Sequence, residues 1–160
     1  MEAIVLAGGY GGRMESFALE RQKCLLPIEG KPVLGHVMEA LVAAFGSVDL
    51  KIGIGFKGEQ VIDYVNHNKP GKVTVTYVPH LPGTEGWGIY KDMRQFVRGK
   101  FVATPGDIIA LPNAYEEVIF KFDEYNVDAA MTLSPDLEAA DTHGIGRMEN
   151  PCQKKPDFGK

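Results

Sequence analysis

Residues 3–13 read AIVLAGGYGGR, a short apolar run followed by two pairs of glycines and an arginine. The run predicts a buried β-strand over residues 3–7, because a strand covered on both faces reads as a continuous hydrophobic stretch. Glycine permits positive φ angles and a close approach of the backbone, so the turn after this strand can wrap N–H groups around phosphate oxygens. This stretch therefore predicts a buried strand followed by a glycine turn that could bind phosphate.

The rest of the chain alternates between helix and strand patterns. Apolar residues at helical spacing predict a helix from Val33 to Phe45, with Pro32 at its first turn and Gly46 just past its end. The other predicted elements are a strand over 51–56, a helix over 60–66, a strand over 73–78, a helix over 87–97, a strand over 101–104, a helix over 115–125 and a strand over 127–133.

This alternation predicts an α/β fold, a Rossmann-like three-layer α/β/α sandwich with a mostly parallel sheet. Ligands in such sheets bind outside the carboxyl ends of the strands. Two predicted loops fall at that edge: the glycine turn, and Gly106-Asp107 after the strand over 101–104.

Composition and charge exclude several classes of protein. The chain of 160 residues carries a net charge of −4 with scattered Lys and Arg, which predicts no nucleic-acid partner. It has no apolar stretch near the roughly 18 residues of a membrane span, and no signal-peptide pattern, so no membrane association is expected. Cys24 and Cys152 have neither metal-ligand spacing nor a disulfide pattern, which favours a reducing, cytoplasmic compartment.

Three interpretations of the glycine turn compete before any resemblance is considered. A P-loop would end in Gly-Lys-Ser or Gly-Lys-Thr, whereas residues 12–14 are Gly-Arg-Met. A dinucleotide fingerprint that starts at Gly9 would place Met14 at its third glycine, and Gly55-Phe56 stands where an acidic residue is expected. A glycine-rich turn that binds no ligand is the third.

The strings LAGGYGGRM at residues 6–14 and KCLLPIEGKPVLGHV at residues 23–37 resemble the signature of the sugar-1-phosphate nucleotidylyltransferases. Residues 83–86 (GTEG) resemble the loop that this family places beside the nucleobase. Residues 104–107 (TPGD) resemble its strand-terminal Gly-Asp. The four segments occur in the family's order.

The resemblance implies transfer of a nucleoside monophosphate from a nucleoside triphosphate to a sugar 1-phosphate, with release of pyrophosphate. It implies two catalytic cations: Arg13, which grips the triphosphate, and Lys23, which reaches the α-phosphate. It implies that Asp107 holds the cofactor Mg²⁺, a metal that takes one or two carboxylates plus substrate oxygens. The implied nucleotide-binding residues are Leu6, Ala7, Gly8, Gly9, Gly11, Gly12, Gly83 and Thr84.

The chain departs from the family in length, since family members continue for about a hundred residues more. We expect a nucleotidyltransferase domain over residues 1–148, mainly its nucleotide-binding half, and an irregular tail over 149–160. Two alternatives stay open: a non-catalytic nucleotide-binding or regulatory module, and an enzyme for a smaller acceptor of the molybdopterin, cobinamide or methylerythritol phosphate type. An exposed sheet edge would favour a homo-oligomer. The sequence identifies neither the base nor the sugar.

Overall fold

The protein is described by a computed structural model that covers residues 1–10, 20–80 and 92–131. Its first compact unit, Met1–Pro112, contains a four-stranded sheet. The strands are β1 (Glu2–Ala7), β4 (Val48–Ile54), β5 (Val73–Pro79) and β6 (Phe101–Pro105). They lie in the order β5-β4-β1-β6, and every neighbouring pair is parallel. The predicted α/β fold with a parallel sheet is confirmed.

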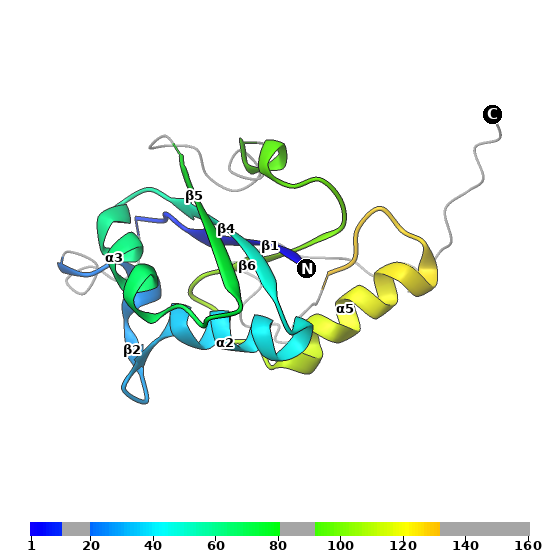
Figure 1. The fold of residues 1–160 in the computed structure, drawn as a ribbon, viewed down its shortest axis with the longest axis horizontal. Coiled ribbons are helices and arrows are strands. Elements are labelled where there is room, and N and C mark those ends of the chain that lie inside the picture. The colour runs from blue at the N-terminus through cyan, green and yellow to red at the C-terminus, as the bar shows by residue number, and fades with distance from the viewer. Residues whose placement is uncertain (11–19, 81–91, 132–160) are drawn as a thin grey trace, which may run out of the picture. The chain divides into compact units, whose positions relative to one another are not determined.

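Two helices occupy the crossovers between the first three strands of this sheet. α2 (Val33–Phe45) connects β1 to β4, and α3 (Gly58–Asn68) connects β4 to β5. Both connections advance in the same direction across the sheet, so right-handed crossovers place both helices on one face (Figure 1). The helices touch, because a Cβ added at Gly35 of α2 would run into the hydroxyl of Tyr64 on α3.

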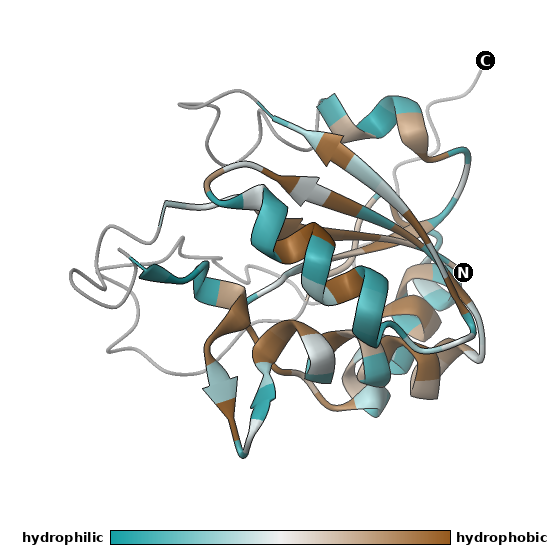
Figure 2. Ribbon diagram, turned by 60° about the vertical axis from the view of Figure 1, so that its left-hand side comes forward, coloured by the Kyte–Doolittle hydropathy of each residue, from teal (hydrophilic) through white to brown (hydrophobic). Residues whose placement is uncertain are grey.

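Residues just before β6 pack on the opposite face of the sheet. Met93 is fully buried there in a cluster with Ile4 and Val78, and Leu6 and Val97 pack against it. The helical segment ends as a 3-10 helix, Arg94–Phe96, so the predicted helix over 87–97 ends before Val97. Its residues 87–91 lie outside the described part. Figure 2 shows hydrophobic residues along the strands, between the segments on either face.

The ends of α2 follow the sequence rules. Pro32 is the N-cap residue, and Gly46 adopts a φ of 74° while its N–H donates to the carbonyl of Val42 at 2.8 Å. β4 begins at Val48, three residues before the predicted start. The polar residues at its start pair with each other, since Lys51 Nζ lies 2.7 Å from Asp49 Oδ1. This contact lowers the pKa of the Asp49 carboxyl and lets both side chains occupy a strand.

A short hairpin between β1 and α2 was not predicted. A 3-10 helix, Lys23–Leu25, precedes β2 (Pro27–Ile28) and β3 (Lys31–Pro32), which pair antiparallel. Glu29 and Gly30 between them have φ angles of 51° and 80°. Two positive φ angles in succession are typical of the type I′ turn, which joins the two strands of a hairpin through a two-residue loop.

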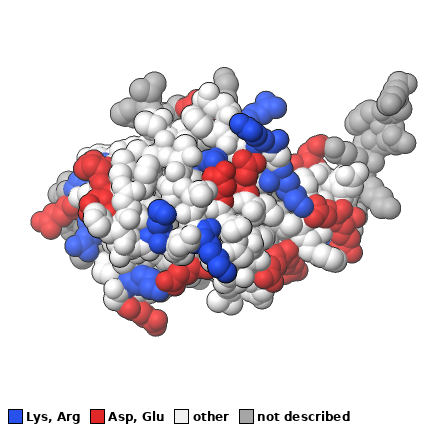
Figure 3. Space-filling model, viewed as in Figure 1, with Lys and Arg blue, Asp and Glu red and all other residues white. Residues whose placement is uncertain are grey.

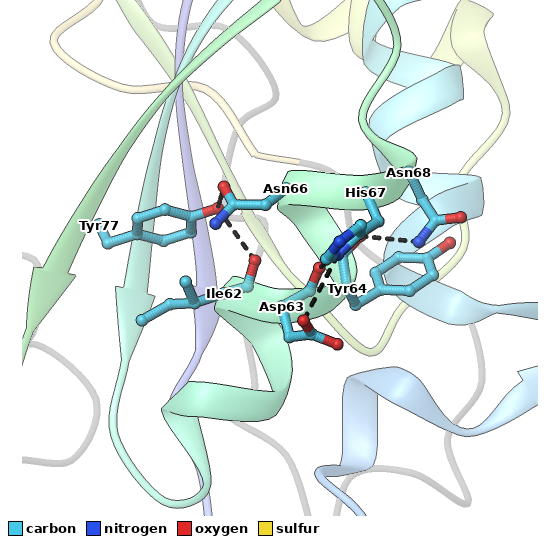
Figure 4. A network of polar contacts seen from close by, with 7 residues as sticks. All are labelled: Ile62, Asp63, Tyr64, Asn66, His67, Asn68 and Tyr77. Atoms are coloured by element: carbon cyan, nitrogen blue, oxygen red, sulfur yellow. Dashed lines mark hydrogen bonds and ion pairs between the residues drawn. The ribbon is translucent and has the colours of Figure 1, made fainter.

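Polar contacts fix α3 against β5 (Figure 4). The hydroxyl of Tyr77 lies 2.8 Å from Oδ1 of Asn66 and 3.4 Å from the carbonyl of Ile62. Asn68 donates to the carbonyl of Tyr64 at 2.9 Å near the end of the helix. α3 therefore has a defined position behind the strand whose carboxyl end leads into His80.

The second unit, Asn113–Lys160, is described as far as residue 131. Its helix α5 (Pro112–Tyr125) confirms the predicted helix, and Asn126 at its end has a φ of 46°. The predicted strand over 127–133 is wrong over residues 127–131, which form no strand. An apolar stretch becomes a strand only beside a partner for its N–H and C=O groups, and Met131 is 69% exposed.

The predicted domain limit at residue 148 and the tail over 149–160 lie outside the described residues and stay predictions. Within the described part of the chain, none of the helices combines the length and the apolar character needed to cross a membrane.

Candidate functional site

The site lies where the strand order reverses. From β1 the chain moves to β4 and β5 on one side, and it returns to place β6 on the other side of β1. In open parallel sheets, ligands bind in the crevice outside the strand ends at such a switch point. Here the ends of β1 and β6 carry the two predicted loops, and the N–H of Gly106 donates to the carbonyl of Leu6 at 2.8 Å. The topology therefore brings Gly8-Gly9 beside Gly106-Asp107.

Lys23 and Asp107 meet at this switch point. Lys23 Nζ lies 2.6 Å from Asp107 Oδ2, and the two side chains are 43% and 26% exposed. Partly exposed pairs contribute about 0.2–1 kcal/mol to folding stability, so stability is a weak reason for this one. Solvent still reaches both charges at the edge where ligands bind in such sheets, which makes Lys23 a candidate partner for an anion and Asp107 a candidate partner for a cation.

Gln22 holds Lys23 in place, and sequence reasoning did not find it. Its side chain is buried and donates to the carbonyls of Ala7 at 2.8 Å and Gly9 at 3.2 Å, while its Oε1 accepts from the N–H of Cys24 at 2.7 Å. Its backbone N–H donates to Oε1 of Gln60 on α3 at 2.9 Å. One amide thus fastens the segment before Lys23 to the end of β1.

Cys24 lies behind the charged pair and is not a nucleophile. Burial and then the negative charge of Asp107 raise the pKa of its thiol to about 12. A thiol that stays protonated near neutral pH neither attacks an electrophile nor binds a metal readily. Cys24 therefore serves as packing beneath the site.

The two glycines that follow β1 differ in their surroundings: Gly8 is packed against the protein, whereas Gly9 is exposed. Gly8 is buried, and a Cβ added there would overlap Nε2 of His80 and lie 2.8 Å from the backbone nitrogen of Gly55. Gly9 is exposed, and a Cβ added there would meet nothing within 4 Å. Gly8 is thus required by the protein's own packing, whereas Gly9 borders open space.

An aromatic pair stands beside this turn. Tyr10 is 63% exposed, and its ring centroid lies 4.5 Å from that of Phe56 at the end of β4. The N–H of Phe56 donates to the carbonyl of Gly8 at 3.1 Å. The loops after β1 and β4 therefore support each other.

The other predicted site residues divide into two groups. Leu6 packs against the Met93 cluster and Ala7 is buried, so what they offer at the turn is mainly backbone. The remaining predicted site residues, which lie outside the described part, are Gly11, Gly12, Arg13, Gly83 and Thr84.

The described side chains could hold Mg²⁺ only if a bound phosphate and water supplied most of its oxygen ligands. Among the described residues, no group of three or more His, Cys, Asp or Glu side chains could hold a metal ion. Asp107 offers one partly exposed carboxylate, which suits an ion that takes most of its oxygens from phosphates and water. On the face seen in Figure 3, Lys and Arg lie interspersed with Asp and Glu, so the described surface there has no single-sign patch.

The fold and this edge define a Rossmann-like α/β domain whose strand ends form a candidate ligand-binding edge. Residues 3–138 match the family described as MobA-like NTP transferase domain, and the chain belongs to that family.

Curated relatives of the chain include a protein named as a uridylyltransferase. The chain is 34% identical over 147 residues to the UTP–glucose-1-phosphate uridylyltransferase AglF of Haloferax volcanii. The aligned region covers 91% of this chain and 59% of AglF. It is 28% identical over 134 residues to the bifunctional protein GlmU of Methanococcus maripaludis. This aligned region covers 84% of this chain and 29% of GlmU. The chain therefore spans between about a third and three fifths of the length of these relatives.

Solved structures support the fold. A UDP-glucose pyrophosphorylase complexed with UDP-glucose superimposes with a TM-score of 0.68 at 18% identity, over 78% of this chain and 54% of the other. HddC from Yersinia pseudotuberculosis complexed with GMP-PN superimposes with a TM-score of 0.62 at 24% identity, over 79% of this chain and 54% of the other.

Proposed function

We propose that the chain transfers a nucleoside monophosphate from a nucleoside triphosphate to a sugar 1-phosphate. A phosphate oxygen of the sugar attacks the α-phosphorus and forms a new P–O bond. The bond from that phosphorus to the oxygen bridging to the β-phosphate breaks, and pyrophosphate leaves. The observation that carries the proposal is the Lys23–Asp107 pair at the switch point, beside the open side of Gly9.

Each group has a role that its chemistry suits. Lys23 neutralises charge on the phosphoryl oxygens as the new bond forms, which is the main requirement when two anions react. Asp107 would hold Mg²⁺, which would supply further charge neutralisation when bound. Lys23, whose ammonium lies 2.6 Å from the same carboxylate, is the cation of this chain that is available to the phosphates. Gly9 lets the triphosphate approach the backbone, and Arg13 remains a proposed second cation.

The relatives favour a sugar phosphate as the acceptor. Two are named as a glucose-1-phosphate thymidylyltransferase and a D-glycero-α-D-manno-heptose 1-phosphate guanylyltransferase, from Streptomyces griseus and Aneurinibacillus thermoaerophilus. Their names combine different bases with sugar 1-phosphates, so the acceptor class is the feature they share. We propose an intracellular enzyme whose further partners are other copies of the chain.

The test is pyrophosphate release from each nucleoside triphosphate with a panel of sugar 1-phosphates, with and without Mg²⁺. Lys23→Ala should lower kcat/KM on the order of 10²–10³-fold, the usual loss for one preorganised charge stabiliser. Lys121→Ala is the matched control, because Lys121 is also 43% exposed and also ion-paired, with Glu124 in α5. Asp107→Asn should remove the Mg²⁺ dependence of triphosphate binding.

Two results would contradict the proposal. Tight triphosphate binding without turnover for any sugar or smaller phosphate acceptor would indicate a nucleotide-binding module instead. Equal rates for Lys23→Ala and Lys121→Ala would remove Lys23 from the site.

A further inference from the structure

The side chain of Gln60, in the first turn of α3, makes two hydrogen bonds to the segment that leads into Lys23. Its Oε1 accepts from the N–H of Gln22 at 2.9 Å, and its Nε2 donates to the carbonyl of Glu20 at 3.1 Å. The partners are 38 and 40 residues apart in the sequence, so both bonds are tertiary contacts. One amide group therefore joins α3 to the stretch of chain immediately before Lys23.

The two bonds have the pattern of a parallel strand pair. In such a pair, one residue donates its N–H to a carbonyl of the neighbouring chain and accepts the N–H two residues further on. The amide of Gln60 bonds to the carbonyl of residue 20 and to the N–H of residue 22 in the same way. A carboxylate would keep only the acceptor, and an apolar side chain would keep neither group. This arrangement therefore requires a side-chain amide.

Gln22 carries the restraint from α3 to Lys23. It is the N-cap residue of the 3-10 helix that begins at Lys23, and its Oε1 accepts from the N–H of Cys24 at 2.7 Å. Its Nε2 donates to the carbonyl of Ala7, in β1, at 2.8 Å. Gln22 is thus held through its backbone by α3 and through its side chain by β1. Lys23 follows it directly, and its Nζ lies 2.6 Å from Oδ2 of Asp107.

One of the two Gln60 bonds adds little to folding stability. The bond to the carbonyl of Glu20 is exposed, so water would satisfy that carbonyl if the amide were removed. A second bond from the same planar amide does restrict the orientation of the segment, because a single bond would leave the segment free to rotate about it. The pair of bonds is therefore better suited to fixing a direction than to stabilising the fold.

We propose that Gln60 is a positioning residue for Lys23, a statement that rests on the proposed function. The ammonium of Lys23 must lie at the phosphoryl oxygens as charge develops there, and a misplacement of about 1 Å can lower the rate by as much as 10²-fold. Gln60 contacts no reacting group. It acts through Gln22, whose backbone sets where the lysine side chain starts.

The test measures whether Gln60 acts through Lys23. Gln60→Met keeps the helix propensity of an unbranched side chain and removes both hydrogen bonds. We expect kcat for pyrophosphate release to fall on the order of 10-fold while KM for the nucleoside triphosphate stays nearly unchanged, because Lys23 acts on charge that develops during transfer. In the Lys23→Ala background, the same substitution should lower kcat no further, since its effect passes through that ammonium.

Gln95→Met is the matched control for Gln60→Met. Gln95 lies in the same unit, and its amide also donates to a backbone carbonyl, that of Asp92 at 3.1 Å. This variant should keep the kcat of the wild type. Gln60→Glu is the second variant, in case Gln60→Met does not fold. It keeps an acceptor for the backbone of residue 22 and loses only the donor, so kcat should fall severalfold, again only while Lys23 is present.

Three results would contradict the inference. Equal kcat in the Gln60 variants and Gln95→Met would overturn it and leave the proposed function intact. An equal loss of kcat with and without Lys23 would also overturn it, because the amide would then only stabilise the fold. A wild type that releases no pyrophosphate with any acceptor would overturn the proposed function and the inference together.

Discussion

Alanine at Gly8 should destabilise the fold, whereas alanine at Gly9 should not. At Gly8 the added Cβ would overlap the ring of His80 and lie 2.8 Å from the nitrogen of Gly55. The ring can move, but a backbone nitrogen cannot move cheaply. Overpacking of this kind costs about 1–3 kcal/mol. For a chain of this size, that corresponds to a fall in Tm of roughly 2–12 °C.

Thermal melts followed by circular dichroism, with urea unfolding as a second measure, give both values. Gly9→Ala should melt with or slightly above the wild type, because its Cβ meets nothing and alanine lowers the entropy of the unfolded chain. The double variant Gly8→Ala/His80→Ala completes a thermodynamic cycle. It should recover only part of the Gly8→Ala loss, because the contact with Gly55 remains.

The reasoning fails if Gly8→Ala and Gly9→Ala melt together. It also fails if the cycle shows no coupling between Gly8 and His80. Full recovery in the double variant would mean that the backbone of Gly55 yields more easily than a 2.8 Å contact implies.

Two further predictions concern buried polar groups. Cys24 should resist iodoacetamide in the native state at pH 8, as read by mass spectrometry, because burial raises its pKa to about 12 from 9.0. Its protonated thiol contributes stability that is complete below pH 9.0 and is lost as pH rises toward 12, so the urea midpoint should fall over that range. Rapid labelling of folded protein would contradict this. Asp49→Ala should lower the free energy of unfolding by about 1–3 kcal/mol, because it leaves the buried ammonium of Lys51 without its ion-pair partner. Lys51→Met removes that ammonium and should leave the urea midpoint nearly unchanged. Equal losses of stability in the two variants would contradict this prediction.

Local patterns predicted the strands and helices of the first unit well. The apolar run before the glycines gave β1, and proline and glycine gave the limits of α2. Each of these signals acts within a few residues. Over residues 127–131 the same reasoning was wrong, because an apolar run carries no information about whether a partner strand lies beside it.

The candidate site could be predicted only where its residues follow strand ends. Asp107 and Gly8-Gly9 were found because the carboxyl ends of parallel strands share one edge. Gln22 was missed, since its bonds to Ala7 and Gly9 reach across 15 and 13 residues and nothing near it in the sequence marks them. The position of the His80 ring could not be predicted either, because one sequence does not reveal that two distant glycines leave space for it.

The candidate site can form during folding only after β1 has paired with β6. β1 can pair with β4 early, but its other edge must wait for a strand roughly 100 residues further along the chain. Until then the open edge of β1 offers unpaired N–H and C=O groups to other chains. If a nucleotide binds at the switch point as proposed, it would hold the late strand in place and should suppress aggregation during refolding as well as raise stability at equilibrium.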